Sequence, residues 1–135
     1  MRMMRSRWIA GPHPRGEAPV LVSRTDFHLH RLADLPRAAL AGWRLARLWP
    51  GLDGAVGLWL WCDLADRRIG SVSVWRDEAA LRDFVRLAPH VRIMRAYRGR
   101  GTLTSTSVRT AQADLWAHLR LPSVTPDCHR PAMWP

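Results

Sequence analysis

Residues 71–100, SVSVWRDEAALRDFVRLAPHVRIMRAYRGR, decide the fold because they predict a strand that runs into a helix. The valines alternate with serines and with Trp75, which is the period of two expected of a strand with one buried face. Asp77 then provides a helix N-cap, and Glu78 places negative charge in the first turn, where the helix dipole favours it. We therefore predict a strand that ends near Trp75 and a helix that begins after Asp77.

The helix after Asp77 has an apolar side and a break. Leu81, Phe84 and Val85 recur at helical spacing and form that side. Pro89 lacks an N–H group and disfavours helical geometry at the residue before it, so we expect a kink or a restart there. Beyond the break, one side of the helix carries three residues at i, i+4 and i+7, namely His90, Met94 and Tyr97.

The segment upstream, residues 20–30 (VLVSRTDFHLH), alternates in the same way as the strand before Trp75. Phe27 and Leu29 share one face, while Asp26, His28 and His30 share the other. This pattern predicts the first strand, with one buried face.

Two further strands and a helix complete the pattern. Residues 35–49 predict a helix with Pro36 in its first turn, where a missing N–H does no harm, and Pro50 and Gly51 end it. Residues 55–63, AVGLWLWCD, are too apolar for simple alternation, so both faces of this strand should be covered. A turn then leads into the strand before Trp75, which predicts a hairpin, and residues 102–108 predict a Thr-rich last strand.

The resulting order, β, α, β, β, α, β, predicts the α+β, ferredoxin-like fold, a four-stranded antiparallel sheet with helices on one face. The other face needs cover. Trp59 and Trp61 on one strand suggest that a second copy of the chain supplies it, as an isologous homodimer that forms a dimeric α/β barrel.

Domain organisation follows from the distribution of helix and strand breakers. Prolines and glycines in residues 1–19 predict a flexible basic arm, residues 20–121 form the ferredoxin-like domain, and residues 122–135 form a Pro-rich tail. Within the domain, residues 110–121 are compatible with a short terminal helix. Two cysteines without metal spacing indicate a reduced, cytoplasmic protein, and no stretch approaches the ~20 apolar residues of a membrane span.

The charge balance allows two interpretations. Twenty-one basic residues against 11 acidic ones give a net charge of +10, which favours an anionic partner. All 21 are arginine and the chain has no lysine or asparagine, as GC-rich coding would produce, so a solvated basic surface is the alternative. Arg95, Arg98 and Arg100 beside Tyr97 would suit nucleic acid or another polyanion, although no nucleic-acid-binding motif is present.

The strand, Trp75, the acidic helix start, Phe84, the break and then His90, fifteen positions after Trp75, form a pattern over residues 20–108. This pattern resembles the antibiotic-biosynthesis-monooxygenase superfamily of dimeric α/β barrels, near its haem-binding and spheroidene-monooxygenase-like members. The resemblance implies a monooxygenase, or a ligand-binding protein derived from one. Its ligand would be an aromatic or tetrapyrrole small molecule in a pocket between helix and sheet.

The resemblance also implies roles for particular residues. His90 and Trp75 would be catalytic, with His90 as general base or as haem-iron ligand and haem as the candidate cofactor, otherwise none. Some monooxygenases of the superfamily use an asparagine on the first strand, and this chain has no asparagine, so Asp26 or His28 would have to stand in. The remaining implied ligand-binding residues are Phe84, Met94 and Tyr97.

These residues also have plain structural interpretations. His90 can be a partly buried histidine near a helix break, and Trp75 and Phe84 can be core aromatics. His28 and His30 lie on one face of a strand, a metal-compatible geometry, but no third ligand is evident.

Overall fold

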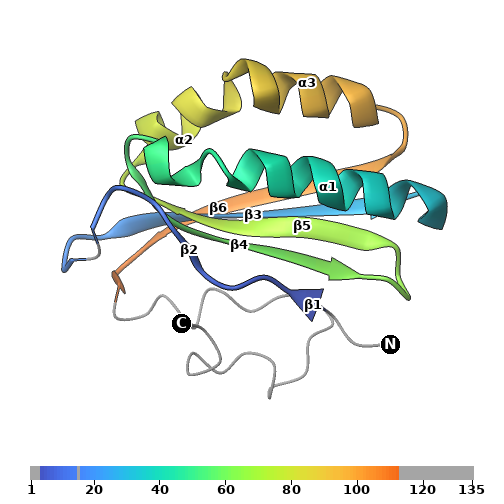
Figure 1. The fold of residues 1–135 in the computed structure, drawn as a ribbon. Coiled ribbons are helices and arrows are strands. Elements are labelled where there is room, and N and C mark those ends of the chain that lie inside the picture. Colours follow the sequence, from blue (N-terminus) through green and yellow to red (C-terminus); the bar gives the residue numbers. More distant parts are fainter. Residues whose placement is uncertain (1–3, 15, 113–135) are drawn as a thin grey trace.

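The computed structural model describes residues 4–14 and 16–112, which form one sheet with helices on one face (Figure 1). From residue 20 onward the elements follow the predicted order, with the second helix in two parts, so the ferredoxin-like fold is confirmed. The strands of this part are β3 (Val20–Leu29), β4 (Ala55–Asp63), β5 (Arg68–Trp75) and β6 (Gly101–Thr110). The helices are α1 (Leu35–Ala46), α2 (Glu78–Val85) and α3 (Ala88–Tyr97).

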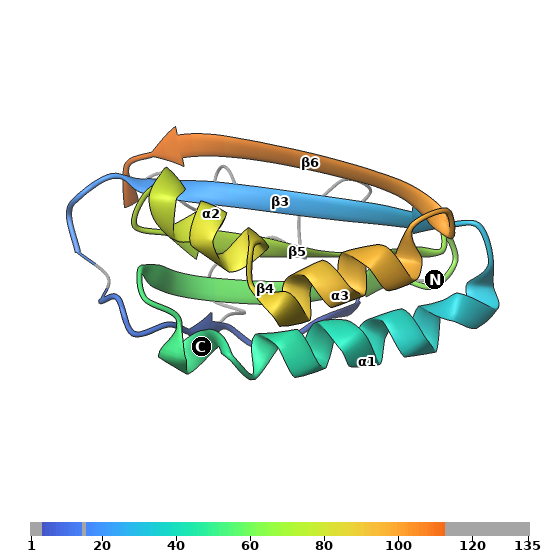
Figure 2. The same ribbon diagram turned by 90° about the horizontal axis from the view of Figure 1, so that it is seen from above.

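The four strands lie in the order β4, β5, β3, β6, and each is antiparallel to its neighbours. β4 and β5 form the predicted hairpin, and β3 pairs along its length with both β5 and β6. Seen from above, α1 lies alongside β4, α2 lies over β3 and β5, and α3 lies over β5 and β4, so neither α2 nor α3 covers β6 (Figure 2). The helix side of β3 and β5 is therefore enclosed, and β6 is an exposed edge strand.

The N-terminal segment corrects one prediction. Residues 1–19 were expected to be a flexible arm without strands, but β1 (Met4–Arg5) and β2 (Ile9–Ala10) pair with β4 and extend the sheet to six strands. The outer edge of β4 presents unpaired N–H and C=O groups, which short segments can satisfy without any hydrophobic periodicity of their own. The amide of Ser6, for example, donates to the Leu60 carbonyl at 2.8 Å.

The helix boundaries follow the capping residues. The Asp77 carboxylate accepts a hydrogen bond from the Ala80 amide at 2.9 Å, as its predicted N-cap role requires. α2 ends at Val85, and α3 restarts at Ala88 with Pro89 in its first turn, so the predicted break is confirmed. α1 ends at Ala46, before the predicted residue 49, and a short 3₁₀ turn follows.

Apolar side chains pack on both faces of the sheet. The buried cluster on the helix side consists of Leu21, Ala46, Trp49, Ala55, Leu58, Trp75 and Ala80. The cluster on the opposite side consists of Val20, Val22, Val56, Trp59, Trp61, Val72 and Val74. Trp8 packs edge-on against Trp59 there, with ring centroids 4.7 Å apart.

The tryptophans on this second face are already buried within one chain. Trp59 is 2% exposed and Trp61 is 3% exposed within a single chain. They therefore do not need a second copy to leave water, and the homodimer stays a prediction.

Several predictions lie outside the described residues. The Pro-rich tail and most of the terminal helix expected over residues 110–121 fall there, and Thr110 itself ends β6. Cys62 is a free cysteine. Within the described ranges no helix is both long and apolar enough to cross a membrane.

Candidate active site between the helices and the sheet

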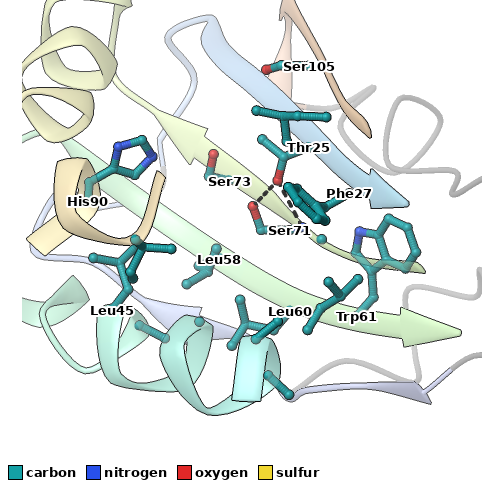
Figure 3. Close-up of a pocket in the computed structure, with 18 of the residues that line it drawn as sticks. Thr25, Phe27, Leu45, Leu58, Leu60, Trp61, Ser71, Ser73, His90 and Ser105 are labelled. Atoms are coloured by element: carbon teal, nitrogen blue, oxygen red, sulfur yellow. Dashed lines mark hydrogen bonds between the residues drawn. The ribbon is translucent and has the colours of Figure 1, made fainter. Parts of the chain in front are cut away.

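A cavity of about 770 Å³ lies between the helices and the sheet, a size typical of small-molecule sites (Figure 3). Small residues of α1 leave this space, because Ala38, Gly42 and Ala46 recur every four residues along its lining side. A Cβ added at Gly42 would meet no atom within 4 Å. The sequence A-x-x-x-G-x-x-x-A on α1 is therefore the feature that makes room for a ligand.

The upper walls of the cavity are apolar. They are formed by side chains of α1, β4, α2 and α3, including Leu45, Leu58, Leu60, Phe84, Ile93 and Met94. Cys62 also lines the cavity, and burial, with a smaller contribution from Asp63, raises the pKa of its thiol. Cys62 is thus a neutral thiol rather than a reactive thiolate at neutral pH.

The floor of the cavity is polar. Two rows of hydroxyl side chains cross the three strands β5, β3 and β6 at directly paired positions. The first row is Ser73, Ser23 and Ser107, and the second is Ser71, Thr25 and Ser105. A hydroxyl can donate or accept a hydrogen bond, so the rows can bind a ligand oxygen. Ser73 is already used, since its hydroxyl donates to the Ser23 carbonyl at 3.3 Å.

Two contacts place hydroxyls of the floor. The oxygens of Thr25 and Ser71 are 2.7 Å apart, as drawn in Figure 3. The Trp75 indole donates to the Ser73 hydroxyl at 2.9 Å. The buried tryptophan therefore orients one hydroxyl of the first row.

His90 lies on the helix side of the cavity, facing the strands of the floor (Figure 3). Its Nδ1 is 3.1 Å from the carbonyl oxygen of Val85, at the end of α2. A carbonyl can only accept, so Nδ1 carries the proton and Nε2 is the nitrogen left for a ligand. Burial lowers the pKa of His90, against a smaller opposing effect of that hydrogen bond, so the ring is neutral at pH 7.

The structure brings four of the sequence-predicted residues together around this cavity: Phe84, His90, Met94 and Tyr97. The rings of Phe84 and His90 meet edge-on at 5.0 Å, and Tyr97 meets Phe27 in the same manner at 6.3 Å. Phe27 was expected only as an apolar strand residue, and here it belongs to the lining.

Trp75, by contrast, lies behind the wall. It is 0% exposed and packs against Trp49 and Phe84, with ring centroids 4.7 and 5.2 Å away. Trp75 therefore does not line the cavity, and the alternative interpretation as a core aromatic is the one that the structure has.

Asp26 and His28 do not line the cavity, contrary to the prediction from the sequence. Side chains alternate along β3, and it is Ser23, Thr25 and Phe27 that face the cavity. Asp26 lies on the other face, where its carboxylate accepts from Arg68 at 2.7 Å. The polar first-strand groups available to a ligand are thus hydroxyls.

The described residues also bear on the metal and basic-cluster hypotheses. No three His, Cys, Asp or Glu side chains gather into a metal site in residues 4–14 and 16–112. The basic cluster is divided, because Arg100 binds Asp34 at 3.0 Å while Arg98 lines the cavity.

Neither the hydroxyl rows nor the small residues of α1 were identified from the sequence. Both left a signal. Each of β3, β5 and β6 has a pair of hydroxyl residues two positions apart (23 and 25, 71 and 73, 105 and 107), and alanine or glycine recurs every four residues in α1.

No family model matches this chain, and no curated protein matches it. Solved structures do match. SnoaB, a cofactor-independent oxygenase from Streptomyces nogalater, is 20% identical with a TM-score of 0.54, over 78% of this chain and 100% of that one. A ferredoxin-fold protein from Listeria monocytogenes, related to antibiotic biosynthesis monooxygenases, is 14% identical with a TM-score of 0.58, over 68% of this chain.

The chain spans only part of some of these proteins. It covers 56% of the Listeria monocytogenes protein and 44% of a candidate monooxygenase from Lactobacillus acidophilus, which is 11% identical with a TM-score of 0.58. At these identities the comparisons show the fold. The resemblance to antibiotic-biosynthesis monooxygenases is therefore confirmed for the fold, and the chemistry has to be argued from the cavity.

Proposed function

We propose that this chain binds an aromatic small molecule in the cavity and oxygenates it without a cofactor, with His90 as the general base. The observation that carries the proposal is the state of the His90 ring. The ring is neutral, its Nδ1–H donates a hydrogen bond to the Val85 carbonyl, and its Nε2 is left for a ligand in an apolar-walled cavity. A neutral imidazole held in one tautomer is a suitable base near pH 7.

The rest of the cavity supplies what such a reaction needs. Nε2 would remove a proton from a phenol, or from carbon next to a carbonyl, and leave an electron-rich anion that can reduce oxygen. The Thr25 hydroxyl would donate to the oxygen on which the charge develops, while it accepts from the Ser71 amide and the Ser71 hydroxyl. SnoaB is named a cofactor-independent oxygenase, which supports the idea that this fold can host such chemistry.

The missing asparagine is part of this proposal. In place of an amide, the cavity-facing positions of β3 carry Ser23 and Thr25. A hydroxyl, like an amide, can donate a hydrogen bond to a substrate oxygen. Thr25 is partly exposed and lies in the middle of the floor, so we assign it this role in place of Asp26 or His28.

An anthrone tests the proposal, since its oxygenation by O₂ yields an anthraquinone and water and can be followed as oxygen uptake. The wild type should accelerate the uptake, and His90→Gln should lower the rate about 100-fold or more, the usual contribution of a general base. His28→Gln is the matched control because His28 lies on the opposite face of the sheet. Equal rates for His90→Gln and the wild type would refute His90 as the base.

Haem is a second candidate ligand, favoured by the same His90 nitrogen. The Nδ1–H of His90 donates to a backbone carbonyl, as in metal-bound histidines, so His90 would hold the haem iron and Arg98 at the rim would hold a propionate. The bound haem would supply its own redox chemistry. A haem titration followed by absorbance would show a saturating Soret shift that disappears in His90→Gln; no shift would leave the cofactor-free reaction.

We also propose two partners, a second copy of the chain and nucleic acid. A homodimer would double the mass measured by light scattering during gel filtration. Nucleic-acid binding through Arg95, Arg98 and Arg100 would weaken steeply with salt and would not depend on His90.

A further inference from the structure

The charged residues around the cavity all have the same sign. Among the described residues that line it, Arg5 and Arg98 are arginines, His90 is neutral, and none is an aspartate or a glutamate. Because no carboxylate lines the described part of the cavity, an anionic group of a ligand meets no repulsion there, and Arg98, which is exposed to solvent at the rim, can attract it.

Arg98 is the more available of the two arginines. At this end of the sheet, the Asp34 carboxylate is paired with Arg100 at 3.0 Å. Arg98 forms no ion pair with any residue in the described part of the chain. Its guanidinium is thus free to bind a ligand.

Space beside Arg98 is open as well. Gly99 follows it with a φ of +82°, and a Cβ added there would meet no atom within 4 Å. Gly99 and Gly101 both line the cavity. The place of a side chain at Gly101 is filled by the His28 carbonyl and the Phe27 ring, so Gly99 alone leaves room next to the guanidinium.

Arg98 and His90 mark two ends of the ligand. Arg98 directly follows α3, while His90 is in its first turn, so eight residues at 1.5 Å each separate them by about 12 Å along the helix. Arg5 lies at the same end of the sheet as Arg98, because it pairs with Trp61 near the β4–β5 turn. Both positive charges are therefore remote from the proposed base.

We infer that the aromatic substrate carries a carboxylate, and that Arg98 binds this group at the β4–β5 turn end while the opposite end of the molecule reaches His90. Guanidinium and carboxylate match in plane and spacing, so Arg98 would determine specificity and orient the ring system. This inference rests on the proposed function, since it assigns the substrate class of the same cavity.

Two matched probes test it: anthraquinone-2-carboxylate and the uncharged 2-methylanthraquinone, with affinity measured by quenching of tryptophan fluorescence. The wild type should bind the carboxylate about tenfold more tightly, the value of one charge-assisted hydrogen bond. Arg98→Gln should abolish this preference and leave the affinity for the uncharged probe unchanged. Arg92→Gln, on the same helix but away from the cavity lining, should keep the preference.

The outcomes separate this inference from the proposed function. Equal affinities for both probes in the wild type, or an unchanged preference in Arg98→Gln, would overturn the carboxylate site and leave an aromatic-binding cavity. If neither probe binds, the cavity does not bind aromatic molecules, and both the proposed function and the carboxylate site are contradicted. A further check is salt, which should weaken binding of the carboxylate probe alone.

Discussion

The indole of Trp8 occupies the space that a side chain at Gly57 would need. A Cβ built on Gly57 would lie 1.7 Å from Cζ2 of Trp8. Trp8 lies between β1 and β2, and Gly57 is on β4, with which both of these strands pair. A glycine in the middle of β4 thus allows the N-terminal segment to dock on the sheet.

Gly57→Val should therefore displace Trp8 and cost roughly 1–3 kcal/mol in unfolding free energy, as overpacking in a core does. Urea denaturation measures this loss. Trp8→Ala removes the same docking contact, so the double variant should be less destabilised than the sum of the two single variants. Additive losses would mean that the two positions act independently.

Filling the cavity should raise the stability of the protein and weaken ligand binding. Gly42→Leu puts a side chain into open space and replaces glycine in the interior of α1, so we expect a gain of about 1 kcal/mol in unfolding free energy from helix propensity. Binding of an aromatic probe should fall sharply because the leucine takes its place. Thermal unfolding and fluorescence titration measure the two effects.

Arg44→Leu is the control for this variant, since Arg44 is on the same helix, exposed and absent from the lining. It should leave binding unchanged. Unaltered affinity in Gly42→Leu would show that ligands do not use the space beside α1.

His90 should make stability depend on pH. Its pKa in the folded state is lowered below the ordinary value of 6.5, so the unfolded chain takes up a proton first as the pH falls. The contribution of His90 to the unfolding free energy should thus be absent well above pH 6.5 and become unfavourable as the pH drops through that value. His90→Gln should remove this component between pH 7 and pH 5, as measured by urea denaturation at each pH; an identical pH profile would contradict the lowered pKa.

Trp75 should matter for stability more than for ligand contact. Trp75→Phe removes the indole N–H that donates to Ser73 and leaves a small void in a fully buried site, which should cost roughly 1–3 kcal/mol. Probe affinity should change far less than in a cavity variant such as Gly42→Leu. A large loss of probe affinity with little loss of stability would show that Trp75 contacts the ligand.

Local sequence patterns were sufficient for most of the fold. The cap at Asp77, the break at Pro89 and the period of two before Trp75 each have a local physical cause, and the structure has all three. β1 and β2 could not be found in this way, because a two-residue strand has no period. Their pairing depends on the free edge of β4, which is a property of the assembled sheet.

The site was less accessible to sequence analysis. Alternation correctly divided β3 into two faces, with Asp26 and His28 opposite Phe27, but it did not tell which face the helices would cover. Asp26 and His28 were chosen for their chemistry, but the helices cover the opposite face of β3. His90 was found because a helix break beside a histidine is a local feature.

The hydroxyl rows depend on strict registry between three strands. Ser23 and Thr25 share β3 with Arg24 and Asp26 on the other side, so inserting or deleting one residue early in β3 would exchange the two sets. Hydroxyls would turn away from the cavity, and a guanidinium and a carboxylate would enter it. Substrate range in such a scaffold can therefore evolve by point substitution along α1, whereas a length change in β3 would convert the cavity into an ionic site in one step.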